Sequence, residues 1–456
     1  MVASERFDVV VVGAGTAGCM ASKVLASAGL EVCLIDYKPR DLIGKKVCGD
    51  AIGKHHFDNL GLAYPSGGEL ERRILGMRIY SPDQETAFNL KGEGLEGFMV
   101  NRHLFGQRLL KDALDAGTTL IDSTKVVEPI IKDGFIRGVV AINLESDERM
   151  NFMSKVAIDA SGFSAAIRSR LPPETGLETR ISRDDLIICY REIRKLKEPL
   201  PEPNICEIYL NLDVAPGGYY WIFPEGDSKV NVGLGVVARR GSPNPKDQLY
   251  RYVLSNRLFE GSSIIHGGGG YVPTRRPLDN MVWNGLAIVG DAACHVNPIH
   301  GGGMGPSMMG GLIAARGIIE ALEAGEPTEE ALWGINLEFM ECYGAKQAGL
   351  DIFRIFLQGL TNEDLNYGMR YRLVEEVDLL KVSLGEELRL NITDVTRRIF
   401  RGIKRLSLLR RLREAADLIV RMRSLYSNYP KSPSNLPKWR LNVQELVERA
   451  KRSFIG

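Results

Sequence analysis

Three glycines near the start of the chain restrict its fold more than any other feature. An apolar run at residues 9–12 predicts a buried strand, and Gly13, Gly15 and Gly18 follow it at fixed spacing. Gly13 permits the tight turn after the strand, Gly15 lets a diphosphate approach the backbone, and Gly18 lets the next helix pack close to the strand. We therefore predict a strand–turn–helix unit whose helix N-terminus faces a phosphate group.

A second strand and an acidic residue complete this unit. Residues 32–35 predict a parallel strand, and Asp36 stands at its end, 23 residues after Gly13. A carboxylate at that place accepts hydrogen bonds from ribose hydroxyls. A turn that merely needs glycines is the alternative, but both strands, the helix and the acid are in register. The residues that we expect to contact a dinucleotide here are Gly13, Gly15, Thr16, Ala17, Gly18, Asp36 and Tyr37.

A second glycine-rich signature begins 277 residues after Gly13. Residues 286–289 predict a strand, which Gly290 and Asp291 follow. We expect Asp291 to accept a hydrogen bond from a ribityl hydroxyl, and the next helix to direct its N–H groups at the anionic edge of a flavin. The two signatures together predict an FAD site, with an ordinary turn as the alternative for the second. Its expected cofactor contacts are Gly290, Asp291, Pro298, Gly302, Gly303 and Met304.

The length and the cysteines limit the kind of protein. A chain of 456 residues is too long for one simple core, so we expect two or three domains. No apolar run approaches the ~18 residues of a membrane-spanning helix, and the first strand begins too early to leave room for a signal peptide. The seven cysteines are scattered without metal-ligand spacing. We therefore expect free thiols, no metal site and a cytoplasmic location.

The net charge of +1 hides an uneven distribution. Residues 397–456 hold 16 Lys and Arg against 4 Asp and Glu, and the rest of the chain is acidic. Between residues 399 and 426, apolar side chains recur every three or four positions among arginines, which predicts a basic amphipathic helix. Such a helix suits peripheral contact with the cytoplasmic face of an anionic membrane. Packing against the acidic body is the alternative. We expect no nucleic-acid partner.

The order of the predicted elements indicates an α/β fold in which a β-rich domain interrupts a nucleotide-binding domain. Short alternating strand patterns occupy residues 70–100 and 185–275, and the pattern is helical from residue 329 onward. Between them we predict a helix at 101–116, a strand at 119–127 and a hairpin formed by 135–143 and 150–160. The predicted domains are a Rossmann-like FAD-binding domain at 1–70, 101–180 and 280–328, an antiparallel β-sheet substrate domain at 71–100 and 181–279, and a C-terminal helical domain at 329–456.

An aromatic segment lies between the two glycine-rich signatures. Tyr219, Trp221 and Phe223 alternate in a predicted strand, so they share one face of a sheet, and Gly217 and Gly218 precede them. An aromatic face suits a long apolar substrate that offers no hydrogen bonds. A sheet face packed in an ordinary core is the alternative.

Other motifs surround this segment. Cys48 and Gly49 lie in a loop after the second strand, and Arg102 opens the predicted helix at 101–116. A guanidinium suits a diphosphate geometrically. Arg275 and Arg276 stand in the stretch 272–277, where contact with a phosphate head group and bracing of the sheet both stay open.

The order of these motifs resembles the FAD-containing reductases and hydroxylases of the p-hydroxybenzoate hydroxylase type, and over essentially the whole chain it is similar to archaeal geranylgeranyl reductases. The anchors of the motif P-x-x-Y-x-W-x-F-P…V-G-x-G all stand in residues 216–235. The stretch Asp159-Ala-Ser-Gly162 lacks the tight Asp-Gly pair of the hydroxylases, which weakens that alternative. The resemblance implies further FAD contacts at Cys48, Gly49, Ala51, Arg102 and Val126.

The resemblance also implies a reaction, the FAD-dependent saturation of C=C bonds in geranylgeranyl chains of archaeal membrane ether lipids or their precursors. An isolated alkene is electron-rich, so hydride transfer from flavin N5 to one carbon needs protonation of the other. Cys48 is our candidate proton donor, with Tyr219 behind it and Trp221 easing developing positive charge. Flavin tuning, pairing with another sulfur and plain packing are alternatives for Cys48. The expected substrate-binding residues are Gly217, Gly218, Tyr219, Trp221 and Phe223.

The electron donor is open. The glycines at 267–270 run into Tyr-Val-Pro instead of a helix, so we expect either transient NAD(P)H binding or a ferredoxin-like partner. Two other functions also stay open. A flavin hydroxylase or halogenase would consume oxygen, and an electron-transfer flavoprotein would pass electrons to a membrane quinone. The second class generally adds an iron–sulfur module, which the scattered cysteines disfavour.

Overall fold

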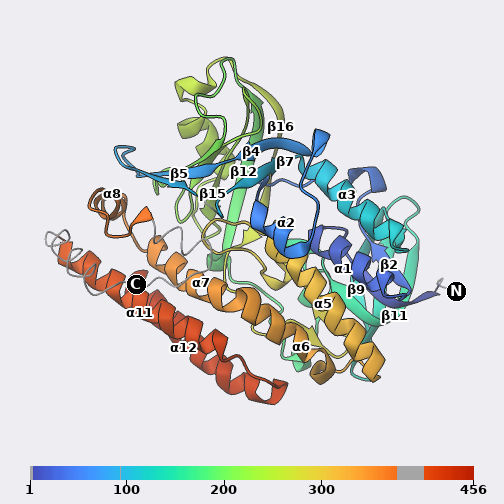
Figure 1. Ribbon diagram of the computed structural model, residues 1–456. Coiled ribbons are helices and arrows are strands. Elements are labelled where there is room, and N and C mark those ends of the chain that lie inside the picture. Colours follow the sequence, from blue (N-terminus) through green and yellow to red (C-terminus); the bar gives the residue numbers. More distant parts are fainter. Residues whose placement is uncertain (1–3, 93, 377–404) are drawn as a thin grey trace.

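A computed structural model describes residues 4–92, 94–376 and 405–456. It confirms the predicted α/β fold class, with a parallel-centred sheet, an antiparallel sheet and C-terminal helices (Figure 1). Within the described part of the chain, no helix is both long and apolar enough to cross a membrane.

The first sheet carries the N-terminal glycine-rich turn. Its strands run in the order β17-β18-β11-β1-β2-β8, with β10 and β9 joined beside β11, and its central pairs are parallel. Residues 9–12 of β1 are buried, as their branched apolar side chains predict. The strands are β1 Ser4–Val12, β2 Val32–Ile35, β8 Thr119–Ile121, β9 Thr124–Lys132, β10 Phe135–Asn143, β11 Arg149–Asp159, β17 Val282–Trp283 and β18 Leu286–Ile288.

Helices α1 (Thr16–Ser27) and α5 (Met304–Ala324) pack against each other beside this sheet, and α3 (Arg102–Asp115) packs on α1 (Figure 1). Their approach depends on glycine, since a Cβ at Gly311 would lie 2.3 Å from the carbonyl oxygen of Ala17. The N-termini of α1 and α5 therefore come close together at one end of the sheet.

An antiparallel sheet forms the β-rich region at the top of Figure 1. Its order is β16-β12-β15-β14-β13-β5-β6, and only its β13–β5 pair is parallel. A small three-stranded sheet in the order β3-β7-β4 is separate, since its strands pair only with one another among the described residues. The antiparallel-sheet strands are β5 Gly76–Tyr80, β6 Ala87–Lys91, β12 Leu186–Lys195, β13 Ile205–Tyr209, β14 Tyr220–Pro224, β15 Lys229–Val237 and β16 Ser263–Pro273; the small-sheet strands are β3 Ala51–Gly53, β4 Leu70–Ile74 and β7 Gly97–Val100.

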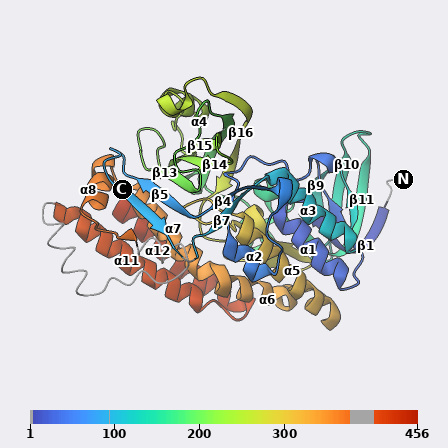
Figure 2. The same cartoon turned by 45° about the horizontal axis from the view of Figure 1, so that its top comes forward.

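Helices dominate the C-terminal part of the chain. In Figures 1 and 2, α11 and α12 run along α7 at the edge of the molecule, and these three helices contact one another. The remaining α-helices include α2 beside the small sheet. The bounds are α2 Lys54–Leu60, α4 Pro245–Gln248, α6 Glu329–Phe339, α7 Ala345–Gln358, α8 Asn362–Arg370, α11 Leu406–Ser427 and α12 Leu436–Phe454.

The predicted basic amphipathic helix is confirmed from Leu406 onward, whereas residues 399–404 of that prediction lie outside the described residues. The buried side chains of α11 include Leu412, Leu418 and Met422, and the helix contacts α7 and α12. Arg405, just before α11, pairs with Asp364 at 2.7 Å. Packing on α7 and α12 therefore accounts for the apolar stripe in α11, and membrane contact stays a prediction.

One local prediction was wrong. The strand predicted at residues 119–127 is split into β8 and β9, because Ser123 has a φ of +45° and its N–H bonds to Lys38 O. The region 185–275, which the sequence predicts to be dominated by strands and turns, also contains α4 and a π-helical turn at Leu249–Val253. The hairpin of β10 and β11 is confirmed.

Candidate functional site

The glycine-rich turn after β1 has the geometry that a diphosphate needs. Gly13 has a φ of +104°, and a Cβ at Gly18 would lie 1.9 Å from Gly13 O. A Cβ at Gly15 would meet nothing within 4 Å, so the backbone there faces open space. No side chain caps the N-terminus of α1, which leaves the N–H groups near Thr16 and Ala17 for an anion.

Asp36 is fixed beside this turn. Its Oδ2 accepts a hydrogen bond from Ala14 N at 2.7 Å, and its Oδ1 accepts one from Lys38 N at 2.9 Å. Tyr37, the next residue, is exposed. Val126 lies buried in β9, which begins beside Asp36 because Thr124 N donates to Asp36 O. The carboxylate is thus held at the end of β2, where the sequence predicts a ribose contact.

Arg102 provides a sharp test of fit for an anionic cofactor. Its side chain is buried at the start of α3, and neither Nε nor Nη1 has a hydrogen-bond partner among residues 4–92, 94–376 and 405–456. A buried guanidinium without acceptors is costly. An anionic group such as a diphosphate would satisfy it, so the residues present fit the predicted dinucleotide.

The second signature meets the first directly. Gly290 follows β18 with a φ of +68°, and a Cβ there would lie 3.3 Å from Ala17 Cβ at the start of α1. Pro298, Gly302 and Gly303 lie before α5, which begins at Met304 without a side-chain cap. Two uncapped helix N-termini thus flank one region, as an anionic cofactor requires.

The loop that carries Cys48 links both signatures to the β-rich region. Lys46 Nζ forms an ion pair with Asp291 Oδ2 at 2.8 Å. A Cβ at Gly49 would lie 3.4 Å from the Phe223 ring, so this loop contacts the aromatic face. Ala51 begins β3 directly after the loop.

The predicted aromatic face is present. The ring centroids of Tyr219 and Trp221 are 6.0 Å apart, and those of Trp221 and Phe223 are 6.1 Å apart. Tyr219 OH donates to His300 O at 2.7 Å, just before the glycines that lead to α5. The face therefore spans from the Cys48 loop to the second signature.

Gly217 and Gly218 allow strand β14 to begin against β15. Gly217 has a φ of +69°, and a Cβ at Gly218 would lie 2.2 Å from Gly235 O. Their role in the structure is close backbone packing, and their contact with a substrate stays a prediction.

Three protonated donors gather at this place. Burial, reinforced by the charge of Asp50, raises the pKa of the Cys48 thiol. Burial raises the pKa of Cys189 to about 12, and burial together with Cys189 and Cys48 raises the pKa of Tyr219. Each group therefore keeps its proton at neutral pH and can act as an acid. All seven cysteines are free, so Cys48 is not paired with another sulfur in this structure.

Sequence reasoning missed the polar groups beneath this loop. Cys48 O accepts hydrogen bonds from Asn231 Nδ2 at 2.9 Å and from Arg191 Nε at 3.1 Å. Asn231 Nδ2 also donates to Asp50 Oδ2 at 2.9 Å, and Asn231 Oδ1 accepts from Trp221 Nε1 at 3.0 Å. Asn231 was the available signal, because a fully buried amide interrupts an otherwise apolar strand.

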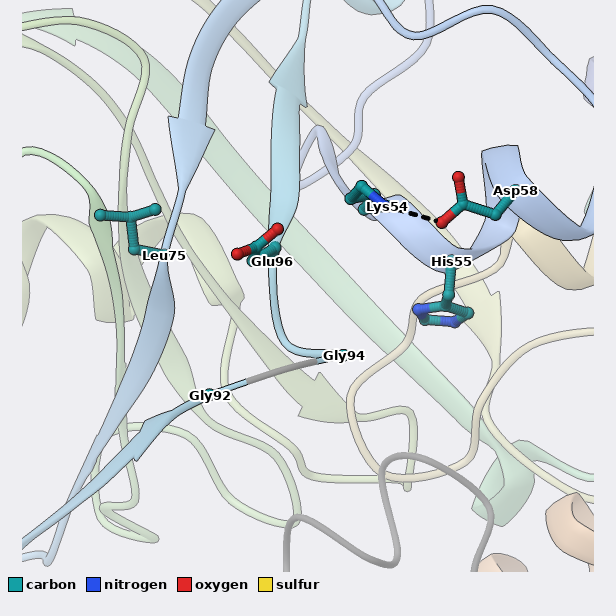
Figure 3. A pocket seen from close by; sticks show the side chains of 7 residues that line it. All are labelled: Lys54, His55, Asp58, Leu75, Gly92, Gly94 and Glu96. Carbon is teal, nitrogen blue, oxygen red and sulfur yellow. Dashed lines mark hydrogen bonds and ion pairs between the residues drawn. The ribbon is translucent and has the colours of Figure 1, made fainter.

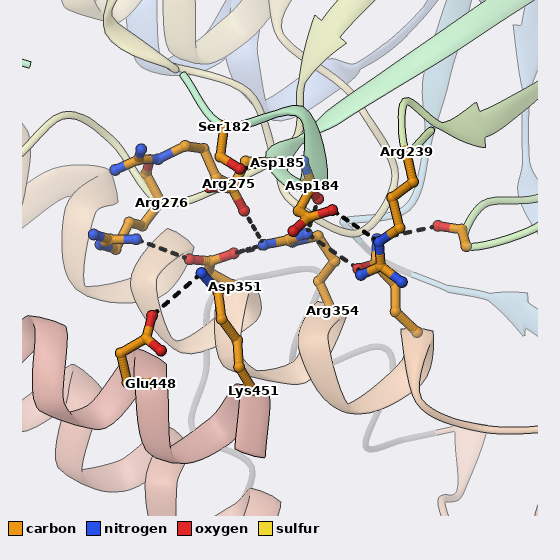
Figure 4. A network of polar contacts seen from close by, with 12 residues as sticks. Ser182, Asp184, Asp185, Arg239, Arg275, Arg276, Asp351, Arg354, Glu448 and Lys451 are labelled. Atoms are coloured by element: carbon orange, nitrogen blue, oxygen red, sulfur yellow. Dashed lines mark hydrogen bonds and ion pairs between the residues drawn. The ribbon is translucent and has the colours of Figure 1, made fainter. Parts of the chain in front are cut away.

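Arg275 and Arg276 brace the fold. Arg275 Nη1 pairs with Glu178 Oε1 at 2.6 Å, and Arg276 Nη1 lies 3.5 Å from Asp351 Oδ2. Figure 4 shows these arginines in a buried network with Arg354 of α7. Of the two roles that the sequence left open, the structure supports bracing.

A surface pocket beside α2 contains none of the predicted site residues. The ion pair between Lys54 Nζ and Asp58 Oδ2, 3.0 Å long, stands at its edge (Figure 3). The pocket is lined by Lys54, His55, Asp58, Leu75, Gly92, Gly94 and Glu96.

Comparison with known proteins decides the family. Over 98% of this chain, 41% of residues are identical to the digeranylgeranylglycerophospholipid reductase of Sulfolobus acidocaldarius, and the match covers 99% of that protein. The chain belongs to this reductase family. The digeranylgeranylglycerophospholipid reductase of Methanothrix thermoacetophila is 30% identical over 85% of this chain and 96% of its own.

Two family models match parts of the chain between residues 8 and 272. The geranylgeranyl reductase catalytic domain matches residues 185–272, which include the aromatic face, and the lycopene cyclase protein model matches residues 8–183. The family resemblance drawn from the sequence is confirmed.

Solved structures agree on the fold. A geranylgeranyl bacteriochlorophyll reductase-like protein from Thermoplasma acidophilum has a TM-score of 0.75 at 23% identity, covering 90% of this chain and 100% of its own. A flavin-dependent brominase has a TM-score of 0.66 at 18% identity, covering 87% and 99%. At these identities the likeness establishes the fold alone.

Proposed function

We propose that this protein binds FAD and saturates C=C bonds of geranylgeranyl chains in archaeal membrane ether lipids or their precursors. The observation that carries the proposal is the aromatic face of Tyr219, Trp221 and Phe223 in contact with the Cys48–Gly49 loop, which links to Asp291 of the second signature. The names of the family's reductases support the same substrate class.

The cofactor would be held by the two glycine-rich turns, the uncapped ends of α1 and α5, Asp36 and Arg102, whose Nε and Nη1 lack a hydrogen-bond partner among the described residues. Bound there in its reduced form, FAD would supply a hydride from N5. The electron donor that reduces the flavin again is either NAD(P)H or a ferredoxin-like protein.

The residues of the chain would supply the other half of the reaction. The aromatic face would hold the apolar chain, exclude water and favour positive charge that develops at the alkene, at about 1–2 kcal/mol for each well-placed ring. The Cys48 thiol would place its proton on the second alkene carbon. Tyr219 OH is committed to His300 O, which makes it a weaker candidate.

An anaerobic experiment tests the proposal. The FAD-loaded protein is reduced with dithionite, excess reductant is removed, and a geranylgeranyl ether lipid is added. We expect the flavin spectrum to return to the oxidised form while the lipid gains mass in steps of two hydrogens. A flavin that stays reduced until oxygen is admitted would instead support a hydroxylase or halogenase.

A further inference from the structure

Two buried carboxyl groups lie beside the candidate proton donor. Asp50 follows Cys48 by two residues and adopts a left-handed backbone with a φ of +63°, which is unfavourable for a residue other than glycine. Glu225 comes from the turn between β14 and β15. Asn231 Nδ2 joins them, since it lies 2.9 Å from Asp50 Oδ2 and 3.4 Å from Glu225 Oε1.

Hydrogen-bond donors are scarce in this cluster. The Asn231 amide has two N–H groups, and Cys48 O and Asp50 Oδ2 both lie 2.9 Å from it. Glu225 Oε1 at 3.4 Å is the third acceptor for these two hydrogens, and Lys229 Nζ is 3.7 Å from Glu225 Oε2. Asp50 Oδ1 is buried without a partner in the described part of the chain. An added proton would satisfy one of these oxygens.

Positive charge is also scarce. Arg191 lies 3.4 Å from Asp50, and Lys229 is shared because its Nζ lies 2.6 Å from Glu71 Oε2. The charge of Arg102, at the start of α3, lowers the pKa of Asp50. This guanidinium also fits the anionic cofactor, so Asp50 shares it. The charged groups that face the pair are Arg191, Arg102, Lys229 and Glu71.

Burial, together with the charge of Asp50, raises the pKa of Glu225 to about 7, and burial raises the pKa of Asp50 to about 6. Near neutral pH the pair is therefore partly protonated, and most of that proton lies on Glu225. A thiol whose pKa stands above its ordinary value is a weaker acid than these carboxyl groups, so proton transfer from carboxyl to thiolate is downhill.

We propose that Asp50 and Glu225 form a buried proton store that reprotonates Cys48 after each double bond is reduced. This rests on the proposed function, in which the Cys48 S–H bond breaks, the alkene carbon gains the proton, and its neighbour gains the hydride. The carboxyl O–H bond then breaks as the S–H bond forms again. Glu225 regains a proton from solvent on the side of Lys229 and Glu71, which are both partly exposed.

Single and repeated turnovers separate this role from others. In Glu225→Gln, an isosteric change, pre-reduced enzyme in excess over lipid should reduce the first bond within about twofold of the wild-type rate, because Cys48 already holds its proton. Steady-state reduction with excess dithionite should fall about tenfold or more, and its decline above pH 7 should flatten. Asp50→Asn should behave alike.

Glu207→Gln is the matched control, because Glu207 lies on β13 of the same sheet and bonds to Tyr209 OH at 2.7 Å. Both of its rates should stay unchanged. Flavin content and the thermal midpoint verify each variant. If Glu225→Gln and Asp50→Asn lose equally in the single-turnover and steady-state rates, or lose in neither, the proposed proton store is wrong. A Cys48→Ala protein with a full single-turnover rate would instead remove the thiol donor, and with it the proposed mechanism.

Discussion

Two clusters of buried charge in this protein respond to burial in opposite ways. In the network of Figure 4, Asp351 contacts Arg354 at 2.7 Å and Arg276 at 3.5 Å. Burial alone would raise the pKa of Asp351, but Arg354, Arg276 and Arg275 outweigh it and hold the pKa below its ordinary value. Beside Cys48, cations are too few, and the pKa values of Asp50 and Glu225 rise.

The two clusters differ in the number of cations that contact their carboxyl groups. That number distinguishes a structural role from a role in proton transfer. The first cluster joins α7 to the loop after β16 and keeps fixed charges, so it suits a structural role. The second has a proton to exchange at neutral pH, next to a thiol and an aromatic face. Four substitutions test this contrast, beginning with the largest expected effect.

Removing the carboxylate of the bracing network should cost most. Asp351→Ala leaves Arg354 and Arg276 buried with fewer partners, and breaking such a pair costs about 3–5 kcal/mol. Thermal and denaturant unfolding measure the loss. Asp115→Ala is the control, because Asp115 forms an exposed ion pair with Lys111, and it should leave stability nearly unchanged. Similar losses of stability in Asp351→Ala and Asp115→Ala would contradict the structural role of the buried network.

Arg102 is a buried cation near the cluster of Asp50 and Glu225, and we expect it to pair with FAD. Losing two charge-assisted hydrogen bonds should weaken FAD binding by about 3 kcal/mol, or roughly 100-fold, in Arg102→Ala. Fluorescence titration of the FAD-free protein gives the affinity. Arg108→Ala on the same helix, where Arg108 pairs with Glu69 at 2.9 Å, should bind FAD normally. Unchanged affinity in Arg102→Ala would remove this residue from the cofactor site.

The carboxyl pair should make stability depend on pH. Glu225 in the folded protein has a pKa of about 7, above the ordinary value of 4.5, so the folded state binds this proton more tightly than the unfolded state. Its contribution is complete below pH 4.5 and is lost as pH rises through 7. Glu225→Gln should therefore gain on the order of 2 kcal/mol relative to wild type between pH 5 and 8. A stability difference that is constant across this range contradicts the shift.

The smallest effect is expected from removing the hydrogen bond between Tyr219 OH and His300 O, because both groups are uncharged. Tyr219→Phe removes the bond to His300 O and should cost about 1 kcal/mol of stability, with single-turnover reduction slowed by less than about tenfold. Thermal unfolding and anaerobic stopped-flow measure the two effects. A loss of about a hundredfold in rate would make Tyr219 the proton donor in place of Cys48.

The sequence could predict what depends on local backbone geometry. Gly13, Gly18 and Gly290 stand where the structure has positive φ or backbone contacts that no Cβ could share, so their spacing alone locates the two turns. The alternation of Tyr219, Trp221 and Phe223 predicts their common face for the same reason. The fold class and the family follow from these segments.

The polar cluster could not be predicted, because its members become neighbours only through folding. Asp50 lies in a loop and Arg191 in β12, 141 residues further along, and the hairpin of β14 and β15 supplies Glu225 and Asn231. Cys189 likewise reaches the site because β12 pairs with β15, where it lies opposite Gly235. The split between β8 and β9 depends on one left-handed residue, Ser123, whose side chain gives no such signal.

The most direct test of the account is the rate at which lipid reoxidises the pre-reduced flavin without oxygen, followed by stopped-flow in the wild type and in Cys48→Ala at equal flavin content. We predict that wild type converts one flavin for each two-hydrogen gain in lipid mass, and that Cys48→Ala slows the step by about a hundredfold or more. Full speed in Cys48→Ala would contradict the thiol as donor, and a wild-type flavin that the lipid leaves reduced would contradict the proposed reaction itself.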